Sequence, residues 1–154
     1  MERGLAMRFT RRSVLGMMLA SAAHAAGPPA RERAIVLFST EADPDLSLAT
    51  LELRKLYLGF TVRHDGHLLR PIRNRSDETL DAVFLQYVVS MSEEIYERRL
   101  LELSLQQGRP RPIEVNSLDA LVRAMAAPHG VSFAWHSDLA RIPGAHLIRV
   151  LWRA

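Results

Sequence analysis

The chain has 154 residues, 48% of them hydrophobic, and it contains no cysteine. Disulfide bonds, thiolate metal sites and cysteine nucleophiles are therefore excluded. The first 25 residues hold four of the 20 basic residues and one of the 17 acidic residues, so the remainder carries 16 of each. A chain that is neutral after residue 25 lacks the basic surface that nucleic-acid binding requires, and we expect no nucleic-acid partner.

Residues 1–25 have the pattern of a signal peptide. Arginines precede the apolar stretch Val14–Ala23, and Ala23-His24-Ala25 fits a cleavage site with small residues on either side of one variable position. The apolar stretch is shorter than the roughly 20 residues that a membrane-spanning helix needs. We expect cleavage near Ala25 or Ala26 and export to the periplasm or another compartment outside the cytoplasm.

The export route stays open between two alternatives. Residues 10–15 (TRRSVL) resemble the twin-arginine export signal, with Val14 where that signal usually carries phenylalanine. An ordinary secretory leader with two adjacent arginines is the other interpretation. The start of translation is also open, because both Met1 and Met7 precede the arginines.

The residues after the signal peptide are enough for one domain with a hydrophobic core, but not for two. Glycine, proline and charged residues fill the segment 26–33, which predicts a flexible lead-in. We therefore expect a single domain over residues 34–154.

The domain opens with a predicted strand and helix. Ala34–Phe38 is uniformly apolar, as in strands that are covered on both faces. Apolar residues then recur with helical spacing over residues 45–60. Ser47 or Thr50 is the predicted N-cap of this helix, and Gly59 is the predicted end.

A turn at Asp65-Gly66 and a strand over His67–Arg73 are expected next. Pro71 lacks an N–H group, which predicts an edge position or a bend for this strand. Ser76 or Asp77 is expected to cap a second helix, which has the clearest amphipathic pattern in the chain. Its apolar positions are Leu80, Val83, Phe84, Tyr87, Val88 and Met91.

The rest of the chain predicts two more helices and three strands, which makes the fold class α/β. The expected elements are a helix that starts at Ser92 and ends near Gly108, a strand at Ile113–Val115, a helix capped by Asn116 or Ser117, and strands over 131–135 and 146–152.

Four segments resemble the substrate-binding proteins of phosphate ABC transporters. The likeness implies a type 2 periplasmic-binding-protein-like fold, here a single lobe with a mixed sheet flanked by helices. In full-length members it also implies an oxyanion held between two lobes. The segments are residues 53–59, which are similar to that family's "el-x-x-iflGk"; Asp65-Gly66 with Pro71-Ile72-Arg73; the helix over Leu80–Met91; and Gly130–Trp135, which is similar to "GaIGY".

The resemblance also implies an oxyanion site at the start of the second helix. The family presents Gly-Ser-Gly-Thr there, and this chain has Arg75-Ser76-Asp77-Glu78-Thr79 instead. Two hydroxyls are kept and arginines are added, but both glycines are replaced, and two carboxylates stand where a dianion would bind. Only the leader precedes Ala34–Phe38, so the family's first phosphate loop has no counterpart. The candidate oxyanion residues are Arg73, Arg75, Ser76 and Thr79.

Catalytic and metal-binding motifs are weak in this sequence. His64-Asp65-Gly66-His67 offers two imidazoles and a carboxylate, but no third strong ligand lies nearby in sequence, which favours an exposed turn over a metal site. No Gly-x-Ser-x-Gly or phosphate-loop signature occurs. We expect neither an enzyme nor a bound cofactor or metal.

The leading interpretation is an exported binding or sensing module that resembles a solute-binding protein and associates with a membrane transporter or sensor. A genuine phosphate-binding or oxyanion-binding periplasmic protein of an ABC transport system is the alternative. A structural interaction domain without a small ligand is the second alternative.

Overall fold

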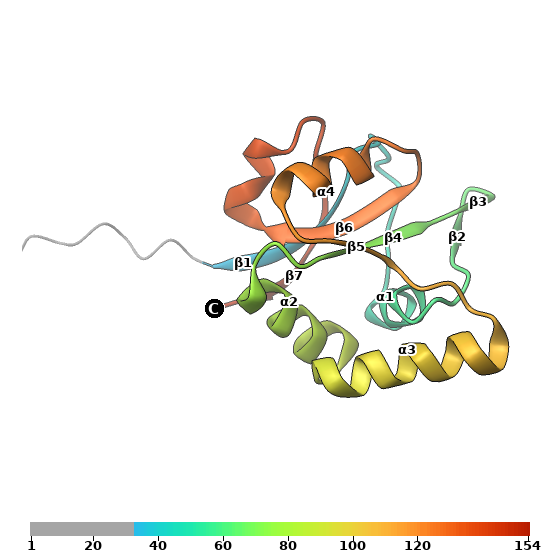
Figure 1. Cartoon of the computed structure of the whole chain (residues 1–154). Coiled ribbons are helices and arrows are strands. Elements are labelled where there is room, and N and C mark those ends of the chain that lie inside the picture. Colours follow the sequence, from blue (N-terminus) through green and yellow to red (C-terminus); the bar gives the residue numbers. More distant parts are fainter. Residues whose placement is uncertain (1–32) are drawn as a thin grey trace, which may run out of the picture. The chain divides into compact units, whose positions relative to one another are not determined.

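The structure is a computed structural model that describes residues 33–154 (Figure 1). The predicted signal peptide (1–25) and the lead-in before Arg33 lie outside the described residues. In chain order the elements are β1 (Ala34–Ser39), α1 (Thr50–Tyr57), β2 (Arg63–His64), β3 (His67–Leu68), β4 (Arg70–Asn74), α2 (Glu78–Phe84), the π-helix η1 (Leu85–Val89), α3 (Glu93–Gln107), β5 (Ile113–Val115), α4 (Leu118–Met125), β6 (Gly130–Trp135), the 3-10 helix η2 (His136–Arg141) and β7 (His146–Arg153).

Five strands form one sheet in the order β5-β4-β6-β1-β7. Strand β4 runs parallel to β5 and β6, whereas β1 runs antiparallel to β6 and β7, so the sheet is mixed. Helices α1, α2 and α3 cover one face and α4 covers the other (Figure 1). The predicted α/β class, with a mixed sheet flanked by helices, is confirmed. Strands β2 and β3 form a separate two-stranded hairpin.

The hydrophobic core lies on both faces of the sheet, and the alternation of side chains along β1 explains why. Ile35 and Leu37 pack on the face with α1, α2, η1 and α3, together with Phe133 of β6. Phe38 packs on the other face, against residues of α4 such as Leu121. All residues of β1 are buried, as its uniformly apolar sequence predicted.

Of the two alternatives that Pro71 predicted, the edge position is wrong, and the predicted strand His67–Arg73 is divided at Leu69 into β3 and β4, which belong to different sheets. Strand β4 lies between β5 and β6. Its pairing with β5 begins only at Ile72, which pairs with Ile113, so this ladder does not need the N–H that Pro71 lacks. Pairing with β6 involves Arg70 and Pro71. The two neighbours thus contact different parts of β4.

The first helix is shorter than predicted, and the predicted caps Ser47 and Thr50 are wrong. Ala49 is the N-cap of α1, and its N–H donates to the Glu52 carboxylate at 2.8 Å. A carboxylate in the first turn satisfies this free N–H without a hydroxyl at the cap. The predicted end at Gly59 is confirmed by its φ of 80°, and the carbonyl of Pro110 lies where a side chain would begin.

The second helix changes from an α-helix to a π-helix after about two turns. At Leu85 it becomes a π-helix, which ends at Ser90 with a positive φ of 63°. The wider turn shifts the phase of the side chains, so Tyr87, predicted on the apolar face, is 55% exposed while Val88 is buried. Arg54 of α1 donates to the Val88 carbonyl at 2.7 Å and to Ser90 Oγ at 2.6 Å, which satisfies groups at the end of this turn.

The other helix ends follow the sequence signals. Asp77, Ser92 and Ser117 cap α2, α3 and α4 with their side chains, and Gly108 ends α3 with a φ of 62°. Over residues 33–154, no helix combines the length and apolar character that crossing a membrane requires.

Candidate functional site

The candidate site begins where β4 ends. Asn74, the last residue of β4, is buried, and its Nδ2 donates to the Phe133 carbonyl of β6 at 3.0 Å. Its Oδ1 accepts from the backbone N–H of Ser76 at 3.0 Å and from Ser76 Oγ at 2.6 Å. Asp77 then accepts from the backbone N–H of Leu80 at 2.8 Å. The chain between β4 and α2 is therefore held in one conformation by its own side chains.

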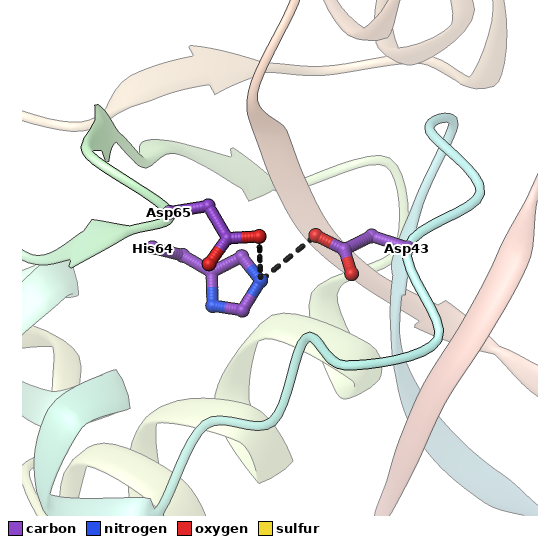
Figure 2. Close-up of side chains that lie close together, drawn as sticks. All are labelled: Asp43, His64 and Asp65. Carbon is purple, nitrogen blue, oxygen red and sulfur yellow. Dashed lines mark ion pairs between the residues drawn. The ribbon is translucent and has the colours of Figure 1, made fainter.

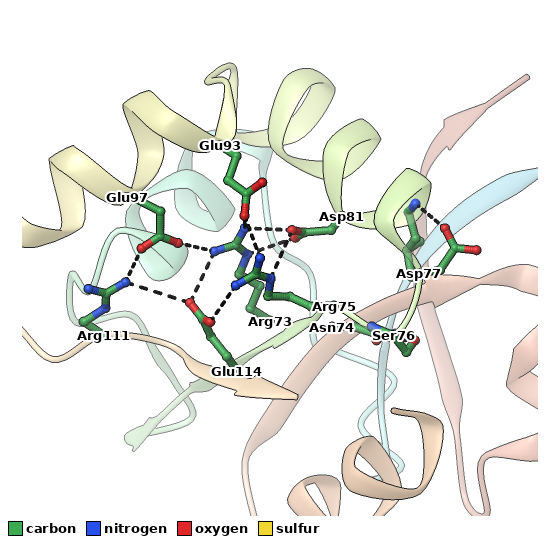
Figure 3. Close-up of polar contacts among 11 residues, drawn as sticks. Arg73, Asn74, Arg75, Ser76, Asp77, Asp81, Glu93, Glu97, Arg111 and Glu114 are labelled. Atoms are coloured by element: carbon green, nitrogen blue, oxygen red, sulfur yellow. Dashed lines mark hydrogen bonds and ion pairs between the residues drawn. The ribbon is translucent and has the colours of Figure 1, made fainter. Parts of the chain in front are cut away.

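Arg73 lies at the centre of a charged network (Figure 3). Its side chain is fully buried and forms a bidentate pair with Asp81 of α2, with Nε–Oδ1 and Nη2–Oδ2 distances of 2.9 and 2.7 Å. Its Nη1 also donates to Glu97 of α3 at 2.5 Å and to Glu114 of β5 at 3.3 Å. The guanidinium lies 4.9 Å from the centre of the Tyr96 ring. One arginine thus links a strand to three other elements.

Two further arginines complete the network. Arg75 Nη2 lies 2.7 Å from Glu93, and its Nη1 lies 3.2 Å from Glu114. Arg111 pairs with Glu97 and lies 3.9 Å from Glu114 (Figure 3). Three guanidinium groups therefore face four carboxylates, so the network has no positive charge left over for a dianion.

The network changes the acidity of its members. Burial lowers the pKa of Arg73, but the hydrogen bonds and charge of Asp81 and Glu97 outweigh it and hold the pKa above its usual range. Burial raises the pKa of Glu97, but hydrogen bonds from Arg73 and Arg111 outweigh it and hold this pKa below its usual value. Burial also raises the pKa of the Tyr96 phenol. The ion pairs therefore persist over the neutral pH range.

Acid is expected to destabilise the domain in part through Glu97. Because its pKa is lower in the folded chain than in the unfolded chain, where it is about 4.3, the unfolded chain binds more protons. The contribution of Glu97 to stability is present at neutral pH and is lost as the pH falls through the folded pKa. Urea unfolding from about pH 7 to about pH 3 measures this slope, which should be shallower in Glu97→Gln. Equal slopes in both proteins would contradict the assignment.

The predicted oxyanion residues lie in different settings. Arg73 and Arg75 both form ion pairs with the Asp81 carboxylate. Ser76 and Thr79 are exposed, and the Ser76 hydroxyl is engaged by Asn74. A groove lies beside the network, and of these four residues only Arg75 lines it. The structure thus brings the two arginines together and leaves the two hydroxyls outside the groove.

The sequence did not identify the carboxylates that engage the arginines. Asp81 is 6% exposed and shares the buried side of α2 with Leu80 and Phe84. A carboxylate on a core-facing side is a signal that a buried cation lies opposite, because an unpaired buried charge is costly. Glu97 and Glu114 carry no comparable signal, since both are partly exposed.

The groove has a volume of about 1180 Å³ and lies at the carboxyl ends of β4 and β5. The connection after β4 leads to α2 on one face of the sheet, whereas the connection after β5 leads to α4 on the other face (Figure 1). In open α/β sheets, ligands bind in the crevice where two such connections diverge. The groove is lined by Arg75, Glu78, Asp81, Ala82, Leu85, Gln86, Ser90, Met91, Ser92, Glu93, Ile95 and Asn116.

Comparison of the chain with protein-family models, curated proteins and solved structures found no match. We therefore infer a function from the residues of this chain and from their arrangement. Those residues provide a groove at the crevice of the sheet, with mixed polar, acidic and apolar walls.

Proposed function

We propose that the chain is an exported, solute-binding-protein-like module that binds a small solute in the groove beside Arg75. It acts by binding or sensing and not by catalysis, next to a membrane transporter or sensor. The observation that carries this proposal is the position of the groove where the connections after β4 and β5 diverge. Of the three carboxylates that line the groove among the described residues, Asp81 and Glu93 already pair with arginines, which favours binding over acid–base or nucleophilic chemistry.

The charge of the groove favours a cationic solute. Glu78, Asp81 and Glu93 line it, against the single guanidinium of Arg75. Glu78 is exposed, whereas Asp81 and Glu93 already contact arginines. An amine of the ligand would therefore meet an excess of carboxylate oxygens, to which it donates charge-assisted hydrogen bonds.

The apolar wall of the groove adds a second requirement for the solute. Leu85, Met91 and Ile95 line the groove next to the acidic side chains, and Ile95 is exposed. Ligand pockets combine apolar walls with a few polar groups that fix orientation. The solute that fits best is a primary amine or amino acid with an aliphatic portion.

The fold is compatible with the family resemblance in its coarse features. A mixed sheet with helices on both faces is what one lobe of a periplasmic-binding-protein-like protein requires. A single lobe presents its groove on an open surface, so a membrane partner or a second copy would supply the opposite wall. Binding of a solute would favour the arrangement in which the two walls are closed over it, and this closed arrangement would signal that the groove is occupied.

The oxyanion alternative has less support from the geometry. A phosphate at Arg73 or Arg75 would have to displace carboxylates that lie within 2.5–3.5 Å of those guanidinium groups. The backbone N–H of Leu80 at the start of α2 already donates to Asp77. Both features disfavour a dianion at the second helix.

Thermal unfolding of the full chain with single solutes at millimolar concentration tests the proposal. A ligand that binds only the folded state raises the unfolding midpoint. At a ligand concentration of about 100 times the dissociation constant, it increases the free energy of unfolding by about 2.7 kcal/mol. We expect a rise with lysine, arginine or putrescine that is lost in Glu78→Gln and Glu93→Gln. Glu102→Gln, which removes an exposed acid paired with Arg99 outside the groove, is the matched control and should keep the rise.

The other outcomes separate the alternatives. If phosphate or sulfate raises the midpoint and Arg75→Ala abolishes that rise, the groove binds an oxyanion and not a cation. No rise with either class would contradict a small-solute function and leave the structural interaction domain. A rise that persists in both groove variants would contradict the assignment of the groove.

A further inference from the structure

A second cluster of polar side chains lies at the other edge of the sheet. Because β1 runs antiparallel to β6, the carboxyl end of β1 meets the amino ends of β4 and β6. The loop after β1 brings Asp43 to this edge, and the β2–β3 hairpin brings His64 and Asp65. Figure 2 shows the three side chains pointing toward one another.

The three side chains have the spacing of metal ligands. His64 Nε2 lies 2.8 Å from Asp43 Oδ2 and 3.8 Å from Asp65 Oδ2, and one ligand atom from each of the three residues lies within 4.8 Å of the other two. Tetrahedral zinc with bonds of about 2.0–2.1 Å places its ligand atoms about 3.3–3.4 Å apart. The two distances from His64 Nε2 lie on either side of that value, so small side-chain rotations would bring the three atoms to a common centre.

His64 provides a second and independent observation. Its Nε2 atom is inaccessible to solvent, and no hydrogen bond of acceptable geometry reaches it from the rest of the described chain. Asp43 Oδ2 lies at an ion-pair distance of 2.8 Å, but the two atoms do not form a hydrogen bond of acceptable geometry. Buried polar atoms without a partner are rare in folded proteins. A cation between the imidazole and the two carboxylates would give this nitrogen a partner.

The surroundings supply room and additional imidazoles. The cluster lines a cavity of about 350 Å³, to which His67, His129 and Glu41 also contribute. The His67 and His129 rings stack with their centres 4.3 Å apart. His129 Nδ1 lies 3.2 Å from Glu41 Oε2, an arrangement that orients an imidazole near a metal.

We propose that Asp43, His64 and Asp65 bind a divalent cation of the first-row transition metals, with Zn²⁺ as the best match. Imidazole together with carboxylates suits zinc, whereas Ca²⁺ and Mg²⁺ prefer oxygen ligands alone. Three protein ligands leave a fourth position for water or for an imidazole that lines the same cavity. The cation would join the loop after β1 to the β2–β3 hairpin, which is not part of the main sheet.

The site stands apart from the proposed solute groove. Among residues 33–154, the two share no lining residue. The sequence alone disfavoured a metal at residues 64–67 because it offered no third strong ligand there; the fold supplies Asp43 from a different segment. Either proposal can fail without the other.

Calorimetric titration of the full chain, with any affinity tag removed and metal stripped by a chelator, tests the site. We expect one Zn²⁺ per chain, no comparable binding of Ca²⁺ or Mg²⁺, and a rise in the unfolding midpoint with Zn²⁺. Asp43→Asn and His64→Gln should each weaken Zn²⁺ binding by more than about tenfold, because even the outer partners of metal ligands cost at least that much. His136→Gln, which alters an exposed histidine outside the cavity, is the matched control.

Two further measurements keep the test decisive. The unfolding midpoint of each variant without metal shows whether it folds, and Asp65→Asn, at an exposed position, provides a variant with little risk to the fold. Absence of Zn²⁺ binding to the wild-type chain would overturn the proposal. Binding that persists unchanged in the variants at positions 43, 64 and 65 would overturn it too.

Discussion

Replacing Arg73 with methionine is expected to lower the free energy of unfolding by about 3–5 kcal/mol. The side chain is fully buried, and its guanidinium is the closest cation to the nearly buried Asp81 carboxylate. Methionine keeps much of the volume but leaves that carboxylate with the more distant Arg75, 3.7 Å away, as its neighbouring cation. Breaking a buried pair on one side costs more than the pair itself contributes, because the remaining charge stays desolvated.

Denaturant unfolding of the full chain at neutral pH measures this effect. The double variant Arg73→Met with Asp81→Leu should recover part of the loss, because it removes both charges. Arg99→Ala removes an exposed partner of Glu102 and should cost at most about 1 kcal/mol. If Arg73→Met were no more destabilising than Arg99→Ala, Arg73 would not be the centre of a buried network.

Phe133→Ala is expected to destabilise the domain by about 3–5 kcal/mol through a different mechanism. Phe133 is fully buried in β6, its ring stacks on that of Phe84 at 3.6 Å between centres, and the Tyr57 ring lies 5.8 Å away. Alanine would leave a cavity between the sheet and the helices of that face, which the two neighbouring rings cannot fill without moving.

The same unfolding experiment distinguishes cavity formation from a general loss of apolar surface. Phe133→Leu should cost clearly less than Phe133→Ala, because leucine fills more of the space. Leu105→Ala alters a residue that is 77% exposed and should stay within about 0.5 kcal/mol of the wild-type chain. Equal losses in the leucine and alanine variants at position 133 would show that ring stacking, and not volume, determines the effect.

The local signals in the sequence predicted the elements well. Gly59 and Gly108 end α1 and α3 with positive φ, and Asp77, Ser92 and Ser117 are the N-caps of α2, α3 and α4. The ends of a helix depend on a few residues that are neighbours in sequence, so the local sequence is enough to predict them. The cap of α1 was missed because its N-cap residue, an alanine, has no polar side chain, and the Glu52 carboxylate satisfies the free N–H instead.

Features that depend on distant segments were harder to predict. Pro71 predicted an edge position or a bend for its strand, and the edge position was wrong because the strands on either side of β4 pair with different residues of it. The exposure of Tyr87 depends on a π-turn, which carried no recognised sequence signal. The position of β4 depends on pairing with distant strands, and the end of the π-turn contacts Arg54 of α1.

The candidate sites show the same division. Arg73 and Arg75 were identified from the sequence, but their carboxylate partners come from α2, α3 and β5 and emerge only in the folded chain. Likewise His64 was recognised as a possible ligand, whereas Asp43 comes from the loop before α1. The sequence identifies the side chains that can bind or react, but the fold determines which of them lie close together.

The place of β1 in the sheet also bears on the order in which the domain folds. The first strand of the described chain lies between β6 and β7, which come from its far end. Contacts between segments so distant in sequence close large loops, and chains dominated by such contacts fold slowly. Strand β1 therefore stays without its partners until β6 and β7 have been synthesised. If the chain is exported as proposed, a translocation machinery that requires an unfolded chain would have time to engage it, whereas one that carries folded proteins would have to wait until β7 has paired with β1.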